Sequence, residues 1–216
     1  MGATDHLMAA EQCDKEAAQH EEMAAEASAR NDTTRLCGDR VMADQVTSGG
    51  ERLIQVSPCW TAEGDTVTRH KAEADRLHLD AEMHRAHARQ LLDAEAASCA
   101  QMPAEELTHT PFAHREDIAN VAAELDGDHV VGARITFRTV PGLTGDWLRQ
   151  AISCHQARAA ALGWDTTYMG YDPAVLPGVK AMVSEDDKGV VTVVLHAKDD
   201  GTALAVYGRA EDLLRW

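Results

Sequence analysis

Two long stretches of the chain, residues 5–30 and 66–98, contain neither Gly nor Pro and repeat one pattern of side chains every seven residues. The repeating residues are His6, Cys13 and His20 in the first stretch and His70, Leu77, His84 and Leu91 in the second, with alanine between them. A seven-residue repeat keeps one seam of a helix facing a partner, and alanine at half of the seam lets two backbones approach closely. We therefore expect two long helices that form an antiparallel pair.

The residues between these stretches, about 33–62, have a different character. They form two mixed runs separated by the turn sequence Ser-Gly-Gly at 48–50, which is typical of an irregular β-hairpin. This hairpin would occupy the tip of the helical pair, where a disulfide between Cys37 and Cys59 would close it. Residues 1–100 are therefore predicted to form a helical hairpin with an inserted β-hairpin.

After residue 100 the pattern changes again. We expect residues 101–126 to be a connecting segment, with a short helix at 115–125. From residue 127, strand-like alternation of apolar and polar side chains gives way to a helical stripe and then to two further strand-like runs around a turn. The expected elements are a strand at 129–140, a helix at 144–162, strands at 178–184 and 189–197, and a helix at 202–215.

This order predicts a small β-α-β-β-α sandwich domain over residues 127–216 and places the whole chain in the α+β class. A right-handed crossover through the helix at 144–162 would make the first two strands parallel, and the hairpin would add the third. In element order alone, the domain resembles the small β-α-β-β-α modules of ring-building secretion proteins and part of a ferredoxin-like fold. No sequence motif of either family accompanies that order.

The charge balance narrows the set of partners. The 216 residues include 36 Asp and Glu against 20 Lys and Arg, a net charge of -16. Both halves of the chain are acidic, so no basic region is available to contact a phosphate backbone, and we expect no nucleic-acid partner. No run of 18 apolar residues is present, so we expect no membrane span.

Cysteine content bears on the cellular compartment. The first residues lack the apolar stretch of a signal peptide. The five cysteines, however, allow two disulfides and one spare thiol. Because disulfides persist in oxidising compartments, we expect a periplasmic or secreted protein.

Histidine, methionine and cysteine supply an unusual number of transition-metal ligands, 11, 8 and 5 respectively, in a chain with only 4% aromatic residues. If Asn31 lies near Thr66, Cys13 falls beside His84, and His20 falls beside Leu77 and His78. His84 and His87 are three residues apart and so share one helix face. With Cys13 and Met83 they would offer nitrogen and sulfur ligands that suit copper or zinc. The candidate ligands on the helical pair are Cys13, His84, His87, His20, His78, His6 and His70.

Two interpretations of this seam remain open. In the first, the chain is a non-catalytic, exported protein that binds copper or zinc on its helical pair. In the second, the seam histidines are spacers that hydrogen-bond across the interface, and the chain is a metal-free structural or assembly protein. The helical hairpin would then dock on a protein partner or on copies of itself.

A second group of cysteine and histidine residues surrounds the junction of the two halves. Their spacings are longer than those of a zinc signature. We expect a disulfide between Cys99 and Cys154, with His155 in the core. The alternative is a second metal site formed by His109, His114 and His155.

The sequence offers little support for an enzyme. Adjacent residues on a helix point about 100° apart, so Cys154 and His155 cannot act directly as a nucleophile and its base. The chain contains no GxSxG, no HExxH, no phosphate-binding Gly-rich loop and no dinucleotide fingerprint. We therefore expect a non-catalytic protein.

Overall fold

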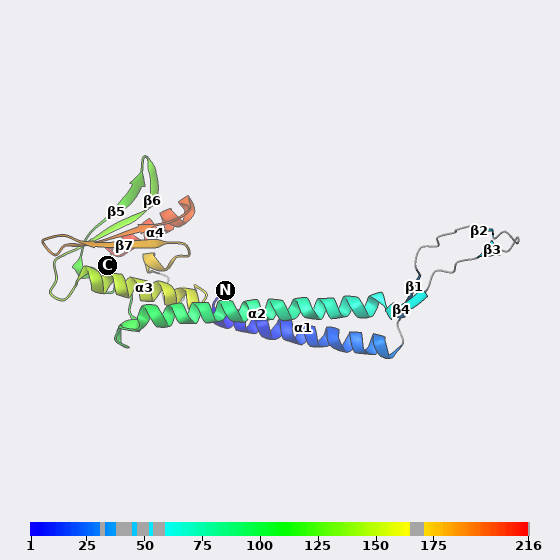
Figure 1. The fold of residues 1–216 in the computed structure, drawn as a ribbon. Coiled ribbons are helices and arrows are strands. Elements are labelled where there is room, and N and C mark those ends of the chain that lie inside the picture. The colour runs from blue at the N-terminus through cyan, green and yellow to red at the C-terminus, as the bar shows by residue number, and fades with distance from the viewer. Residues whose placement is uncertain (31–32, 38–44, 47–51, 54–58, 165–170, 216) are drawn as a thin grey trace. The chain divides into compact units, whose positions relative to one another are not determined.

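A computed structural model describes the chain except for residues 31–32, 38–44, 47–51, 54–58, 165–170 and 216, and the side chains of Thr108 and of all residues from 31 to 63 also lie outside the description. The chain divides into two compact units. One unit is Ala9–His84, and the other comprises Met1–Met8 and Arg85–Trp216. Figure 1 shows the elements of both units, which are described one at a time below.

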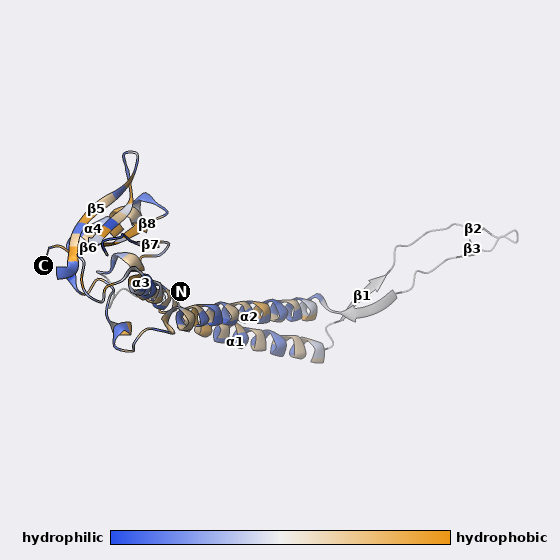
Figure 2. Cartoon of the chain, turned by 60° about the vertical axis from the view of Figure 1, so that its left-hand side comes forward, coloured by the Kyte–Doolittle hydropathy of each residue, from blue (hydrophilic) through white to orange (hydrophobic). Residues whose placement is uncertain are grey.

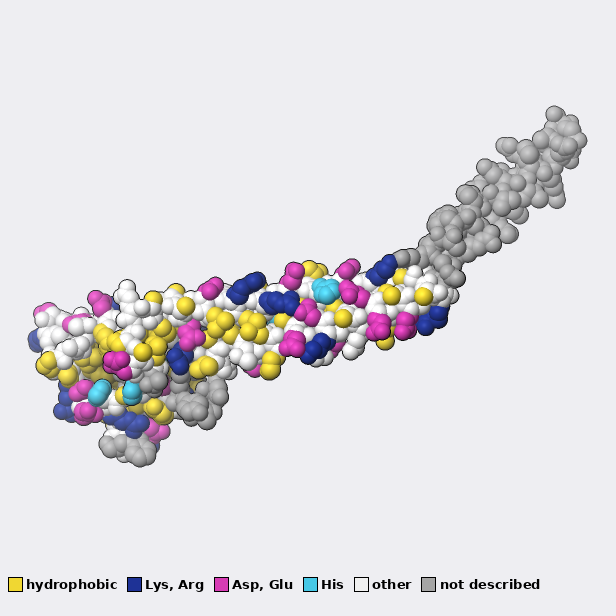
Figure 3. Space-filling model, turned by 90° about the horizontal axis from the view of Figure 1, so that it is seen from below, with side chains coloured by type: hydrophobic (Ala, Val, Ile, Leu, Met, Phe, Trp, Pro, Cys, Tyr) yellow, Lys and Arg dark blue, Asp and Glu magenta, His cyan; other side chains and the backbone are white. Residues whose placement is uncertain are grey.

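The two long predicted helices are present as α1 (Ala3–Ala29) and α2 (Asp65–Cys99). Within the unit of Ala9–His84, the expected seam is buried. Its alanines, each at most 4% exposed, are Ala10, Ala17, Ala24, Ala27, Ala74 and Ala81. Ala17 packs with Ala74 and Leu77 from the other helix, so the heptad pattern marks the contacting faces as predicted. The outer faces carry interspersed acidic and basic side chains (Figure 3).

The residues between the helices form antiparallel strand pairs, as predicted. The strands are β1 (Thr33–Cys37), β2 (Gln45–Val46), β3 (Arg52–Leu53) and β4 (Cys59–Glu63). β1 pairs with β4, and β2 pairs with β3. The register places Cys37 opposite Cys59 in the β1–β4 ladder. The predicted disulfide between them concerns side chains outside the described part of the chain and stays a prediction.

The other unit contains a four-stranded antiparallel sheet in the order β5-β6-β8-β7. Its elements are β5 (Ile118–Asp126), β6 (His129–Phe137), α3 (Gly145–Ala161), β7 (Lys180–Glu185), β8 (Val191–His196) and α4 (Asp200–Asp212). Alternate residues of β6 and β8, such as Ile135 and Val193, are buried in one cluster with Leu148 of α3 and Val206 of α4. Both helices therefore cover the same face of the sheet, and hydrophobic residues recur along its strands (Figure 2).

Two details differ from the sequence prediction. Residues 115–125, expected to be a helix, form the short 3-10 helix η2 (Arg115–Asp117) and then β5. The turn at Gly127 lets this Ala-containing segment pair with β6, so tertiary pairing overrides its local helix propensity. The predicted β-α-β-β-α order is present as β6-α3-β7-β8-α4, preceded by β5.

The strand order also differs. β6 and β7 run in the same direction but are not neighbours, because β8 lies between them and pairs antiparallel with both. β8 has the most regular buried alternation of the four strands, with Val191, Val193 and Leu195 all facing the core. Its apolar side chains are covered best at the centre of the sheet, which explains why β8 and not β7 pairs with β6.

The predicted disulfide between Cys99 and Cys154 is confirmed. It joins the last residue of α2 to the buried face of α3, with 4.7 Å between the two Cα atoms. Nearby, the side-chain amide of Gln150 donates to the carbonyl of Ser98 at 2.6 Å. The C-terminal end of α2 is thus fastened to α3 by a covalent and a polar contact.

We predict that the double variant Cys99→Ser, Cys154→Ser loses about 4 kcal/mol of unfolding free energy, since the bond closes a loop of 55 residues. Urea unfolding followed by circular dichroism measures this loss. Cys13→Ser is the matched control, because Cys13 is a free thiol and its replacement removes no crosslink. Equal stability of the double variant and this control would contradict the structural role of the bond.

Gly132 of β6 provides a second test of the sheet. A Cβ atom at this position would lie 1.7 Å from the carbonyl oxygen of Leu195 in β8. Gly132→Ala should therefore push the two central strands apart and cost about 3 kcal/mol or more in thermal or urea unfolding. Gly127→Ala is the control: its φ of +60° is unfavourable for alanine, but no atom lies within 4 Å, so the expected cost is only about 1–2 kcal/mol.

Candidate functional site

The unit of Ala9–His84 brings together two of the predicted metal ligands, His20 of α1 and His70 of α2. Their Nδ1 atoms lie 2.9 Å apart, and their ring centroids lie 5.2 Å apart. At this distance one Nδ1 carries a hydrogen and donates it to the Nδ1 of the other ring, which accepts through its lone pair. Both side chains are half-buried and can still be reached from solvent.

The other unit contains a second pair built in the same way, His6 of α1 and His87 of α2. Their ring centroids lie 5.4 Å apart, with 54° between the ring planes. His6 is half-buried and His87 is exposed. Each pair therefore consists of one imidazole from each helix, at almost the same separation.

At His20 the pairing differs by one heptad from the alignment expected for the two helices. His20 contacts His70, which precedes the expected neighbour Leu77 by seven residues. Cys13, expected beside His84, packs against the cluster of Ala17, Ala74 and Leu77. A shift of seven residues keeps every seam residue on the seam, so the repeat by itself cannot distinguish the two registers.

His78, another predicted ligand, contacts carboxylates of α1. Its Nε2 lies 3.2 Å from Oε1 of Glu21, and its Nδ1 lies 3.7 Å from Oδ1 of Asp14. The hydrogen bond with Glu21 raises the pKa of His78 above its ordinary value. The carboxylates of Glu21 and Asp14 therefore favour the protonated form of this ring. In the described part of the chain, no three His, Cys, Asp or Glu side chains are grouped closely enough to hold a metal ion.

The three histidines of the second predicted site occupy different environments. His155 is 2% exposed and lies in the core of its unit, as one interpretation of the sequence expected. His109 contacts the carbonyl of Glu105 through Nδ1 at 2.7 Å, and His114 is exposed beside Glu116. His109 and His114 line one cleft of about 680 Å³, to which His155 does not contribute.

The segment before β5 and the loop before α3 form this cleft together, since Pro141 and Trp147 also line it. No pattern in the sequence predicts this cleft. Its lining residues come from segments about 30 residues apart in the chain, and no local pattern of residues marks such a meeting point.

His155 lies instead in the core, where it interacts electrostatically with the buried carboxyl of Asp172. Among the residues that the structure describes, neither ring nitrogen of His155 has a hydrogen-bond partner. Burial lowers the pKa of His155, although the nearby carboxyl of Asp172 opposes this effect. The imidazole is therefore neutral in the folded protein at neutral pH.

Asp172 is fully buried and was not singled out from the sequence. Its carboxyl accepts hydrogen bonds from the hydroxyl of Thr110 at 2.5 Å and from the backbone N–H of Ala174 at 2.8 Å. Burial raises the pKa of this carboxyl, whereas its hydrogen bonds oppose the rise. The Asp-Pro sequence at 172–173 is the one local signal, since it is typical of a helix start, here that of η3 (Pro173–Val175).

Comparisons with known proteins give no assignment for these groups: no protein-family model matches the chain, and neither a curated protein nor a solved structure does. Among the helices that the structure describes, none combines the length and the hydrophobicity that a membrane span requires. The predicted metal ligands that the structure brings together are the two histidine pairs, His20 with His70 and His6 with His87.

The lowered pKa of His155 predicts a pH effect on stability. Because the folded protein keeps this ring neutral, unfolding takes up a proton once the pH falls below about 6.5. Stability from this residue is therefore complete above that pH and is lost as the pH falls, by at most about 1.4 kcal/mol per pH unit. His155→Leu should flatten the dependence of the unfolding free energy on pH between 6.5 and 5.

The matched control is His114→Leu, which makes the same change at an exposed histidine. Urea unfolding at intervals of half a pH unit should give this control the slope of the unmodified protein. Asp172, with its raised pKa, acts in the opposite direction, so its own titration cannot produce the predicted loss. Identical slopes for His155→Leu and the control would refute the assignment.

Proposed function

We propose that this protein is a non-catalytic binder of zinc or copper and that the ion bridges histidines of α1 and α2. The observation that carries the proposal is the pair formed by His20 and His70, whose Nδ1 atoms face each other at 2.9 Å. Imidazole nitrogen is a common ligand of both metals. The pair of His6 and His87 is the second proposed site.

The geometry of the pairs supports this proposal. Two nitrogens bound to one tetrahedral zinc ion at about 2.0 Å lie about 3.3 Å apart, and the centroids of their rings lie about 5 Å apart. The observed centroid separations are 5.2 Å and 5.4 Å. The Nδ1 atoms of His20 and His70 lie 2.9 Å apart, so an increase of about 0.4 Å in this distance would admit the ion in place of the shared proton.

Glu73 is the candidate for a third ligand at the first pair. It lies three residues after His70 on α2, which puts both side chains on one face. Arg76 lowers the pKa of Glu73, and the nearby imidazole of His20 lowers it further. In the structure the Glu73 carboxylate accepts a hydrogen bond from Nε of Arg76 at 3.2 Å, so metal binding would require it to turn. Solvent would supply the remaining position, which favours an exchangeable ion over a permanent structural one.

Two wider properties agree with the proposal. The net charge of -16 attracts cations to the protein. The disulfide between Cys99 and Cys154 favours an oxidising compartment, so we propose a periplasmic or secreted location. In such a compartment the chain would collect or carry the metal without chemical turnover.

A metal-free assembly module is the second candidate. Leu79 and Met83 are 62% and 56% exposed and lie one turn apart on α2, and Met23 is exposed on α1. Hydrophobic side chains also occur among the charges on the outer face of the helices (Figure 3). If the histidines serve only to pair the helices, this apolar surface would dock on a protein partner or on a second copy.

Calorimetric titration with zinc, and with copper in separate runs, tests the metal proposal on the full chain. We predict binding at micromolar or tighter Kd and a higher Tm in the presence of the ion. His20→Ala with His70→Ala should remove one equivalent of bound metal, and Glu73→Gln should weaken that site by about tenfold. His129→Ala, at an exposed histidine outside both pairs, should bind metal as the unmodified chain does.

Different outcomes would point to the second candidate. Absence of stoichiometric metal in the unmodified chain, or equal binding by the paired-histidine variant and the His129→Ala control, would refute the metal proposal. A mass that increases with protein concentration and decreases in Leu79→Ser with Met83→Ser would then support assembly. A monomeric mass at all concentrations would argue against self-association.

A further inference from the structure

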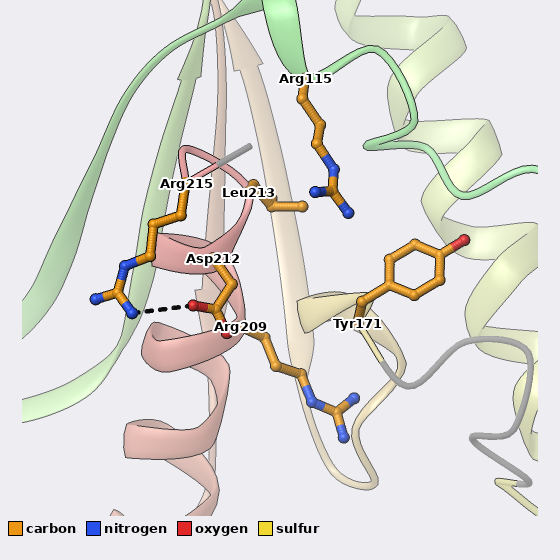
Figure 4. Close-up of a pocket in the computed structure, with 6 residues that line it drawn as sticks. All are labelled: Arg115, Tyr171, Arg209, Asp212, Leu213 and Arg215. Carbon is orange, nitrogen blue, oxygen red and sulfur yellow. Dashed lines mark hydrogen bonds and ion pairs between the residues drawn. The ribbon is translucent and has the colours of Figure 1, made fainter.

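The unit of Met1–Met8 and Arg85–Trp216, called the C-terminal unit below, contains a second hollow. It has a volume of about 500 Å³ and lies at the end of α4. Figure 4 shows the residues around it, which come from three separate parts of the unit. They are Arg115 of η2, Tyr171 just before η3, Arg209 and Asp212 of α4, and Leu213 and Arg215 that follow. None of the ligands considered for a metal lines this hollow.

The hollow is positively charged in a strongly acidic protein. Three of its six lining residues are arginines and one is an aspartate, whereas the chain as a whole has a net charge of -16. Arg215 turns toward Asp212, and the two side chains form an ion pair at 3.2 Å (Figure 4). The guanidinium groups of Arg115 and Arg209 lie at opposite ends of the hollow, and the ring of Tyr171 lies beside the space between them (Figure 4).

The buried Asp172 holds part of this wall in place. Nη1 of Arg209 donates to the backbone carbonyl of Asp172 at 3.1 Å, and the carboxyl of Asp172 is bound by Thr110 and Ala174. Tyr171 immediately precedes Asp172 in the chain, so the same network restrains its backbone. The guanidinium carbon of Arg115 lies 5.8 Å from the centre of the Tyr171 ring. A fixed wall of this kind reduces the entropy lost when a ligand binds.

We propose that this hollow binds a small organic oxyanion. A carboxylate or phosphate group would lie between Arg115 and Arg209, because guanidinium groups bind both anions through paired, charge-assisted hydrogen bonds. A flat apolar part of the same molecule would lie against Tyr171 and Leu213, which supply the aromatic and aliphatic surfaces of the hollow. This site is separate in chemistry from the histidine pairs and does not depend on metal binding.

Titration calorimetry with phenyl phosphate, benzoate and inorganic phosphate tests the proposal on the full chain. We expect one equivalent of phenyl phosphate or benzoate to bind, with a Kd below about 1 mM. If phenyl phosphate has the lower Kd, the hollow prefers a phosphate group; if benzoate has the lower Kd, it prefers a carboxylate. Inorganic phosphate, which lacks the apolar part, should bind at least about tenfold more weakly than phenyl phosphate.

Arg115→Gln and Arg209→Lys should each raise the Kd of the tighter probe by about tenfold or more. Arg138→Gln, at an exposed arginine of the same unit outside the hollow, should leave the Kd unchanged. Arg115→Gln leaves the hydrogen bonds of Asp172 in place, so weaker binding by this variant cannot come from loss of that network, whereas Arg209→Lys changes one of its donors. His20→Ala with His70→Ala should bind the probe normally, which separates this site from the metal proposal.

Absence of saturable binding of all three probes up to about 10 mM would overturn the proposal, because two guanidinium groups acting together should hold such an anion below that concentration. Equal weakening by Arg115→Gln and by Arg138→Gln would overturn it as well. In that case the attraction would be a general effect of charge and would not belong to the hollow.

Discussion

The close packing of α1 against α2 is the constraint on which the proposed metal sites depend. Alanine alternates with larger residues along the contact, and Ala17 and Ala74 are buried there with almost no exposed surface. Because alanine has no side-chain atom beyond Cβ, the backbones approach closely enough for His20 and His70 to meet at 2.9 Å. Such a seam buries little apolar surface, so interactions between the histidines contribute a larger share to the pairing of the helices.

The C-terminal unit is stabilised in a different way, by an apolar core that contains one polar network. An ionisable group that is buried without partners destabilises a fold. Asp172 avoids this cost because its carboxyl is bound by Thr110 and the neighbouring Ala174, and its carbonyl by Arg209; Thr110 and Arg209 are distant in sequence. The same bonds shape the wall of the arginine-lined hollow. A residue that is unfavourable in isolation thus gives this part of the unit a defined geometry.

Much of the architecture follows from local pattern. The boundaries of α1 and α2 agree with the limits of the Gly- and Pro-free stretches to within a few residues, and the disulfide between Cys99 and Cys154 was expected from their positions. The prediction failed at β5, where an Ala-containing segment pairs with β6 against its own propensity. It failed also in the helical register, because a heptad repeat looks the same after a shift of seven residues.

The sequence by itself therefore determined the fold class, the two long helices and the residues that occupy their seam, since all of these depend on periodicity and on neighbours in the chain. Only the tertiary structure decided which seam residues meet, placing His20 against His70 and Cys13 among alanine and leucine. It also decided that Arg115 and Arg209 share one hollow. Contacts between distant residues depend on how whole elements pack, and no short stretch of sequence encodes that arrangement.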